Sequence, residues 1–147
     1  MIREEFNNIH GILPFEKDRE KRWTHFHTTV MDKFLPQLSV DEDRWNSWRY
    51  CYEIHVNENK RELFAHMALS SKNTSGEKRK MIEEIIKKHS IRHTRREKLP
   101  NAFGVDGSKL HLPIPEDKEL WGDLVKKAIQ HLLDFEREKV LPLLTQN

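Results

Sequence analysis

The sequence has little cysteine, glycine and proline, and it has no long hydrophobic run. Its 147 residues include one cysteine, five glycines and six prolines. A lone cysteine cannot form a disulfide within the chain, which favours a reducing compartment, so we expect a cytoplasmic protein. So few glycines and prolines exclude a low-complexity linker. No apolar run approaches the roughly 18 residues that a membrane-spanning helix needs, so we expect no membrane partner.

The chain is instead rich in charged and aromatic residues. Charged residues make up 34% of the sequence, against about 25% in an average globular domain, and hydrophobic residues make up only 36%. Four Trp, seven Phe and two Tyr are too many aromatic residues for a disordered chain. The composition therefore predicts a single folded domain, residues 1–147, with a thin hydrophobic core.

The formal net charge of +2 hides an uneven distribution. Residues 78–98 hold nine basic and three acidic residues, a net charge of +6, whereas the other 126 residues sum to −4. Such a segment attracts phosphate groups or an acidic protein surface. The alternative is a solvated helix face followed by an edge strand protected by charge. The candidate binding residues are Lys78, Arg79, Lys80, Lys87, Lys88, Arg92, Arg95, Arg96 and Lys98.

Hydrophobic periodicity predicts four helices. Apolar residues recur at helical spacing over residues 2–9 and, more regularly, over residues 18–35. A third helix is predicted over residues 74–89, where a Thr-x-x-Glu capping box precedes an amphipathic pattern. The last runs over residues 115–141 and begins with a proline and two acidic residues, a suitable helix entry.

Two alternating segments predict a β-hairpin. Residues 49–56 and 63–69 alternate apolar and polar side chains on either side of a polar turn signal at residues 57–60. Pairing Val56 with Arg61 places the apolar positions of both strands on one face. In that register the polar face brings Cys51 opposite His66. The apolar face holds Tyr50, Tyr52, Ile54, Val56, Leu63, Ala65, Met67 and Leu69.

Two further strands are predicted after the third helix. Residues 91–99 are extended and mostly charged, which is typical of an edge strand, and residues 109–114 alternate with Pro113 near their end. The predicted element order is α-α-β-β-α-β-β-α. This order indicates an α+β fold, in which amphipathic helices cover one face of an antiparallel sheet of about four strands.

The polar face of the predicted hairpin is the main alternative site. It gathers Cys51, Glu53, His55, Glu62 and His66. A thiolate, imidazoles and carboxylates can bind zinc or activate a nucleophile, which supports a metal-dependent nuclease or related hydrolase as the alternative function. A simply solvated polar face is the other interpretation. We expect no metal and no cofactor, because these residues lack the close local spacing of a metal motif.

Other motifs give little support for an enzyme. The sequence has no glycine-rich phosphate loop, no Gly-x-Ser-x-Gly elbow and no Cys-x-x-Cys pair. His25 and His27 look like paired metal ligands, but at positions i and i+2 of the predicted helix they point in different directions. Glu-x-Lys matches at residues 58–60 and 116–118 lie in a turn and a helix entry, whereas restriction-type nucleases place this pair on a strand.

An ordered set of segments resembles a known family. The segments are Glu62–Ala65, Lys80–Glu84, Ile91–His93, Lys109–Leu112 and a helix that starts at Trp121 and ends in Leu141-Pro142-Leu143-Leu144. In this order, residues 62–144 resemble a small α/β domain of unknown function found at the C-terminal end of restriction-modification and phage-defence-associated proteins. That family has no established catalytic residues. The resemblance implies only an accessory role near DNA-handling systems.

These observations together predict a non-enzymatic binding or accessory protein. Its contact surface is expected in the basic segment, residues 78–98, and its partner is expected to be nucleic acid or an acidic protein surface. The expected link to restriction or phage defence comes from the resemblance alone.

Overall fold

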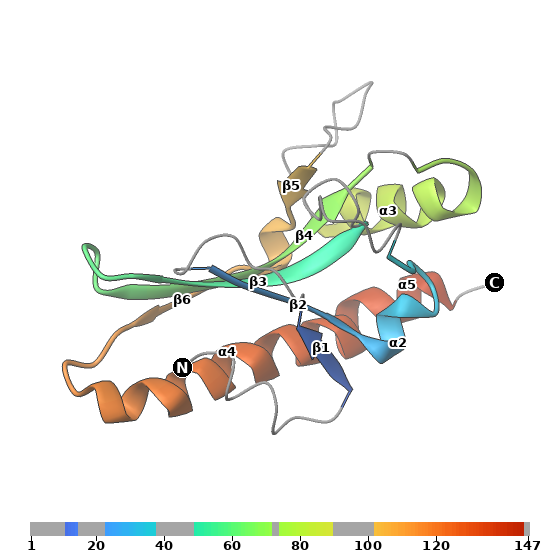
Figure 1. Cartoon of the computed structure of the whole chain (residues 1–147). Coiled ribbons are helices and arrows are strands. Elements are labelled where there is room, and N and C mark those ends of the chain that lie inside the picture. Colours follow the sequence, from blue (N-terminus) through green and yellow to red (C-terminus); the bar gives the residue numbers. More distant parts are fainter. Residues whose placement is uncertain (1–10, 15–22, 38–48, 72–73, 90–101, 146–147) are drawn as a thin grey trace.

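The chain folds into an antiparallel sheet with a long helix across one face (Figure 1). The computed structural model describes residues 11–14, 23–37, 49–71, 74–89 and 102–145. Its strands are β1 Ile12–Pro14, β2 Trp23–Thr28, β3 Tyr50–Asn57, β4 Glu62–Ser70, β5 Ala102–Gly104 and β6 Leu110–Pro113. Its α-helices are α2 Thr29–Asp32, α3 Gly76–His89, α4 Trp121–Phe135 and α5 Leu141–Leu144. It also has the 3-10 turns η3 Asp106–Ser108 and η4 Lys118–Leu120, and the π-helical turn η5 Glu136–Val140.

This arrangement confirms the α+β class and corrects the predicted element order. The described strands and α-helices follow the order β-β-α-β-β-α-β-β-α-α, with six strands instead of about four. The predicted helix over residues 2–9 and the predicted strand over residues 91–99 lie outside the described residues. Within the described ranges, no helix is both long and apolar enough to cross a membrane.

The predicted helix over residues 18–35 is wrong. Residues 23–28 instead form β2, which pairs with β1 on one side and β3 on the other, and only the four residues of α2 are helical. Phe26, Met31 and Leu35 are fully buried, so the apolar residues do reach the core. Their spacing imitates a helical stripe. Threonine and aromatic residues nevertheless favour a strand once a neighbouring strand can pair with them.

The predicted β3–β4 hairpin is confirmed, with its register shifted by two residues. Val56 pairs with Leu63, not with Arg61, because the four-residue turn lies one position later in the chain. The Asn57 side chain accepts a hydrogen bond from the Lys60 backbone N–H, and Arg61 adopts a left-handed φ of 52° that closes the turn. A shift of two keeps every side chain on its predicted face. The predicted apolar face is the buried one, and Tyr52, Ile54, Leu63, Ala65 and Met67 are all at most 1% exposed.

One edge of β4 has two partners. Residues 62–65 pair with β6 and residues 68–70 pair with β5, as the chain returns to the same strand twice. The turn η3 fills the gap between them. The buried Ser108 hydroxyl accepts a 2.7 Å hydrogen bond from Met67 N–H and donates to the Val105 carbonyl, and Val105 N–H donates to the Met67 carbonyl. The backbone of β4 is therefore satisfied along this edge even where its partner changes.

The two long helices match their predicted positions. α4 buries the stripe Val125, Ala128, Ile129, Leu132 and Phe135 against the sheet, and α3 buries Ile82, Ile85 and Ile86. Burying one such side chain contributes about 1.5–3 kcal/mol to folding. We call the sheet face covered by α4 the inner face, and the opposite face the outer face (Figure 1).

Candidate functional site

The first candidate surface is the exposed side of α3. Because Ile82, Ile85 and Ile86 point to the core, basic residues elsewhere on the helix point outward. Lys80, Lys87 and Lys88 are exposed, and none of them has an ion-pair partner among the residues that the structure describes. These three ammonium groups are therefore available for an anion.

Two other predicted contact residues are already engaged. The Lys78 ammonium donates a 2.7 Å hydrogen bond to the Phe34 carbonyl, which ties the start of α3 to the segment after α2. The Arg79 guanidinium lies 3.4 Å from the Glu83 carboxylate, one turn along the same helix. Exposed pairs of this kind contribute little to stability and leave the arginine able to exchange partners.

The described residues include the first part of the basic segment. Residues 78–89 hold five basic and two acidic residues, so the described part carries +3 of the segment's +6. The other predicted contact residues, Arg92, Arg95, Arg96 and Lys98, lie outside the described residues.

The C-terminal end of α3 is held in place by the last helices. His89 Nε2 lies 2.9 Å from the Lys139 carbonyl oxygen. The His89 ring also packs edge-on against Phe135, with ring centroids 5.2 Å apart. Since its N-terminal end is also tied down by Lys78, α3 holds its lysines in a fixed position relative to the sheet.

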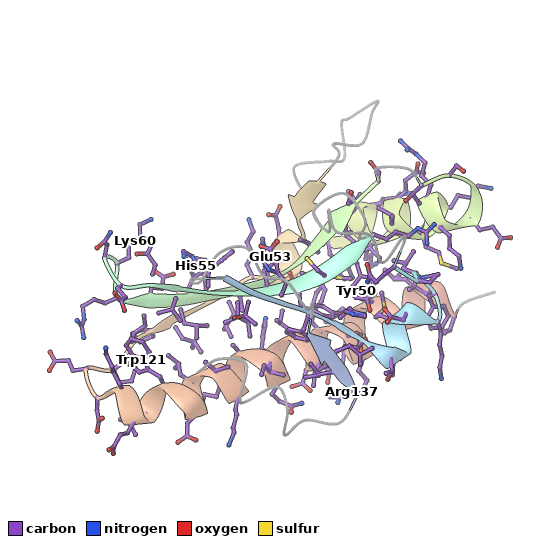
Figure 2. All side chains as sticks on the ribbon, viewed as in Figure 1. Tyr50, Glu53, His55, Lys60, Trp121 and Arg137 are labelled. Atoms are coloured by element: carbon purple, nitrogen blue, oxygen red, sulfur yellow. The ribbon has the colours of Figure 1, made fainter. Side chains whose placement is uncertain are left out.

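The second candidate surface is the outer face of the sheet. Strand alternation brings together here the residues that alternate with the buried apolar ones. Figure 2 shows Glu53 and His55 on this face, away from α4. His25 and His27 also share it, because they lie on a strand and alternate with the buried Phe26. The prediction that these two histidines point in different directions is therefore wrong.

A carboxylate between two imidazoles lies at the centre of the outer face. His66 Nε2 is 2.8 Å from one Glu53 oxygen and His25 Nε2 is 3.6 Å from the other. Burial acts to raise the pKa of Glu53, but the two imidazoles outweigh it and hold the pKa at about 2, below its ordinary value of 4.5. An ionised carboxylate only accepts hydrogen bonds, so the proton in the short contact lies on His66 Nε2.

Close packing fixes the His66 ring in this position. A Cβ atom at Gly104 would lie 2.5 Å from His66 Nδ1, so only glycine fits beside the ring. Cys51 Sγ lies 3.8 Å from Glu53, and Cys51 is 1% exposed. The predicted pairing of Cys51 with His66 is wrong, since the shifted register places Cys51 opposite Ala68 and Glu53 opposite His66.

The proposed hydrolase residues are only partly brought together. Cys51, Glu53 and His66 are neighbours, whereas His55 lies in the next row, opposite Phe64. Glu62 contacts the His111 ring instead of joining the Glu53 cluster. Among the described residues, no group of three or more histidine, cysteine or acidic side chains is arranged to hold a metal ion.

A buried acidic network lies on the inner face, and sequence reasoning missed it. The Thr28 and Tyr52 hydroxyls donate 2.6 and 2.7 Å hydrogen bonds to Glu136, which is 5% exposed. The Tyr50 hydroxyl donates to one oxygen of Asp32, and His27 lies 2.7 Å from the other. Asp32 thus connects the inner face to the outer face.

The π-helical turn η5 contains Glu136 at its start. Burial raises the pKa of Glu136, despite the hydroxyl hydrogen bonds that oppose this effect. Burial also raises the pKa of Tyr50 and of Tyr52 well above 10, so both phenols keep their protons. One sequence signal existed: Glu136 lies four residues after Leu132, on the apolar stripe of the predicted helix. An acidic residue in such a position requires buried donors.

Comparisons with known proteins do not identify a relative of this chain. Neither protein-family models nor curated proteins nor solved structures include a match to this chain. The resemblance of residues 62–144 to a restriction-associated domain therefore stays a prediction. The chain's role is inferred from its two candidate surfaces, the basic side of α3 and the outer face of the sheet.

Proposed function

We propose that the protein binds an anionic partner through the basic segment, residues 78–98, and acts as a non-enzymatic accessory protein. The observation that carries the proposal is the exposed trio Lys80, Lys87 and Lys88 on α3, without an ion-pair partner in the described part of the chain. Nucleic acid is the partner class that we favour, because backbone phosphates bind clustered lysines and arginines independently of sequence. The resemblance of residues 62–144 supports an accessory role in restriction or phage defence.

The hydrolase alternative has weaker support. The imidazoles of His25 and His66 both lie against Glu53, and Cys51 is buried beside it. A general base or nucleophile needs a proton or substrate within reach, whereas these groups face one another. The cluster is best explained as a structural one.

A matched pair of charge reversals tests the proposal. Lys87→Glu/Lys88→Glu changes two adjacent exposed lysines on α3, and Lys126→Glu/Lys127→Glu makes the same charge change on α4. We expect the α3 variant to weaken binding to labelled duplex and single-stranded DNA about tenfold or more, measured by fluorescence anisotropy. The slope of log affinity against log salt should fall by about one per lysine. The α4 variant should bind as the wild type does.

The remaining arginines of the segment give a second test. Reversing Arg92, Arg95 and Arg96 to Glu should weaken binding strongly, because each change replaces a positive charge by a negative one. Equal losses in the α3 and α4 variants would mean that only total charge matters, and the proposal would fail. If the protein binds an acidic protein and DNA does not compete for this binding, the partner is an acidic protein and not nucleic acid.

A further inference from the structure

A row of rings, His55, Phe64 and His111, crosses the outer face near the hairpin turn. Phe64 on β4 lies between two imidazoles, with ring centroids 4.7 Å from His66 and 4.8 Å from His111. His55 lies directly opposite Phe64 on β3. Three neighbouring strands, β3, β4 and β6, thus place His55, Phe64 and His111 side by side.

Solvent exposure rises from His66, beside the row on β4, to His111 on β6. The His66 side chain is 13% exposed, Phe64 and His55 are half-buried, and the His111 side chain is 59% exposed. Neighbouring strands lie about 4.8 Å apart, which spaces the rings regularly, and the His66 and His111 rings are inclined to Phe64 by 53° and 48°. Bases of a single-stranded nucleic acid stack on such rings, whereas the bases of a duplex are already stacked on each other.

Two exposed basic side chains lie next to the row. Lys60 and Arg61 are exposed in the turn beyond it, and neither has an ion-pair partner among the described residues (Figure 2 labels Lys60). The acidic residues on the outer face, Glu53 and Glu62, each contact a histidine, and Glu58 is exposed in the same turn as Lys60 and Arg61. An acidic peptide would gain only the two cations here, but a single strand would use both the cations and the rings.

We infer that the outer face stacks the bases of single-stranded nucleic acid on Phe64, His55 and His111, with Lys60 and Arg61 beside the phosphates. The inference rests on the proposed function only for its premise that the partner is nucleic acid. It adds a second contact surface, and it names the single strand as the form that this surface prefers.

The test compares a labelled oligothymidylate with a labelled DNA duplex. His111→Ala removes the most exposed ring, and Phe64→Leu removes the central one while keeping an apolar side chain. Each should weaken oligothymidylate binding about tenfold, since stacking a base on an aromatic ring contributes about that factor or more. Duplex affinity and the salt slope should not change. His111→Phe should restore binding, and the exposed α4 substitution Gln130→Ala should have no effect.

Each other outcome separates this inference from the proposed function. If ring variants leave oligothymidylate affinity unchanged, or weaken both probes equally, the outer face is not a stacking surface. The same follows if His111→Phe fails to restore binding. If duplex DNA binds and depends on Lys87 and Lys88 while oligothymidylate does not bind, the proposed function stands and this inference fails. If only the ring variants weaken binding, the inference stands and the role of α3 fails.

Discussion

The inner and outer faces of the sheet each bury a carboxylate, and the two carboxylates behave in opposite ways. Glu136 on the inner side accepts hydrogen bonds from two hydroxyl groups, and burial raises its pKa. Glu53 on the outer side lies between two imidazoles, and its pKa falls to about 2. Hydroxyl donors satisfy a buried carboxylate without offering it a positive charge, whereas imidazoles can carry one. The partners, rather than the depth of burial, decide the sign.

The largest expected effect on stability comes from the hydrophobic inner face, and a neighbouring substitution on the outer face should have a much smaller effect. Ile54 is fully buried on the inner face, and its neighbour His55 points the other way. Ile54→Ala should lower the free energy of unfolding by about 2–5 kcal/mol, because it leaves a cavity. His55→Ala should cost less than about 1 kcal/mol. Urea denaturation of both variants checks the pair, and equal losses would contradict the assignment of faces.

The next effect tests the pairing of Glu53 with its imidazoles. The folded-state pKa of Glu53, about 2, lies below its ordinary 4.5. Its contribution to stability is therefore complete above 4.5 and is lost as the pH falls toward 2. The difference corresponds to about 3 kcal/mol. Glu53→Gln should cost up to about this amount at neutral pH and almost nothing near pH 2. A constant cost across this range, measured by denaturation, would disprove the pairing.

A smaller effect on stability is expected at Gly104, where the backbone packs against the His66 ring that contacts Glu53. Gly104→Ala would place a methyl group against the His66 ring and push it away from Glu53, at a cost of about 1–3 kcal/mol. Gly107→Ala is the matched control, because its nearest contacts would be 3.4 Å away, at His89. Thermal denaturation compares them, and NMR shifts of the His66 ring report its movement. Equal stability of the two variants would show that the ring moves freely.

The smallest effect concerns Glu136. Glu136→Gln keeps an acceptor oxygen for Thr28 and Tyr52 and removes the need to bury a charge, so it should change stability by less than about 1 kcal/mol. The raised pKa favours the folded wild type below 4.5, and this contribution is lost as the pH rises through the folded-state pKa. The variant should therefore gain on the wild type as the pH rises. If the variant instead lost stability relative to the wild type as the pH rises, the pKa of Glu136 would be lowered in the folded protein. A positive charge near Glu136 would then be required.

Local patterns in the sequence were enough to predict the hairpin but not its neighbours. Alternation from Tyr50 to Met67 fixed which side chains face the core, and a register error of two left those faces unchanged. The strand at residues 23–28 escaped prediction because Phe26 and Met31 fit a helical stripe equally well. Only the presence of β1 and β3 on either side decides between the two structures, and periodicity carries no information about them.

The contacts within the candidate sites were likewise hard to predict, because they depend on strand register and on long-range contacts. The polar residues of the hairpin were predicted to share a face, but the contact between Glu53 and His66 required the position of the turn, which the Asn57 side chain sets. The third member, His25, comes from a strand that was predicted as a helix. The basic residues of α3 needed only helical periodicity, so their exposure was predictable.

The short strands at the two sides of the sheet bear on the behaviour of the protein at high concentration. Within the described residues, β1 forms one edge and β5 and β6 form the other, and both β1 and β6 end in a proline, Pro14 and Pro113. Proline has no backbone N–H, so an incoming strand finds a gap in the row of donors at either edge. Because β1 has only three residues and β6 only four, an incoming strand could form few hydrogen bonds with either. The sheet is therefore poorly suited to grow by strand addition, which opposes aggregation into fibres.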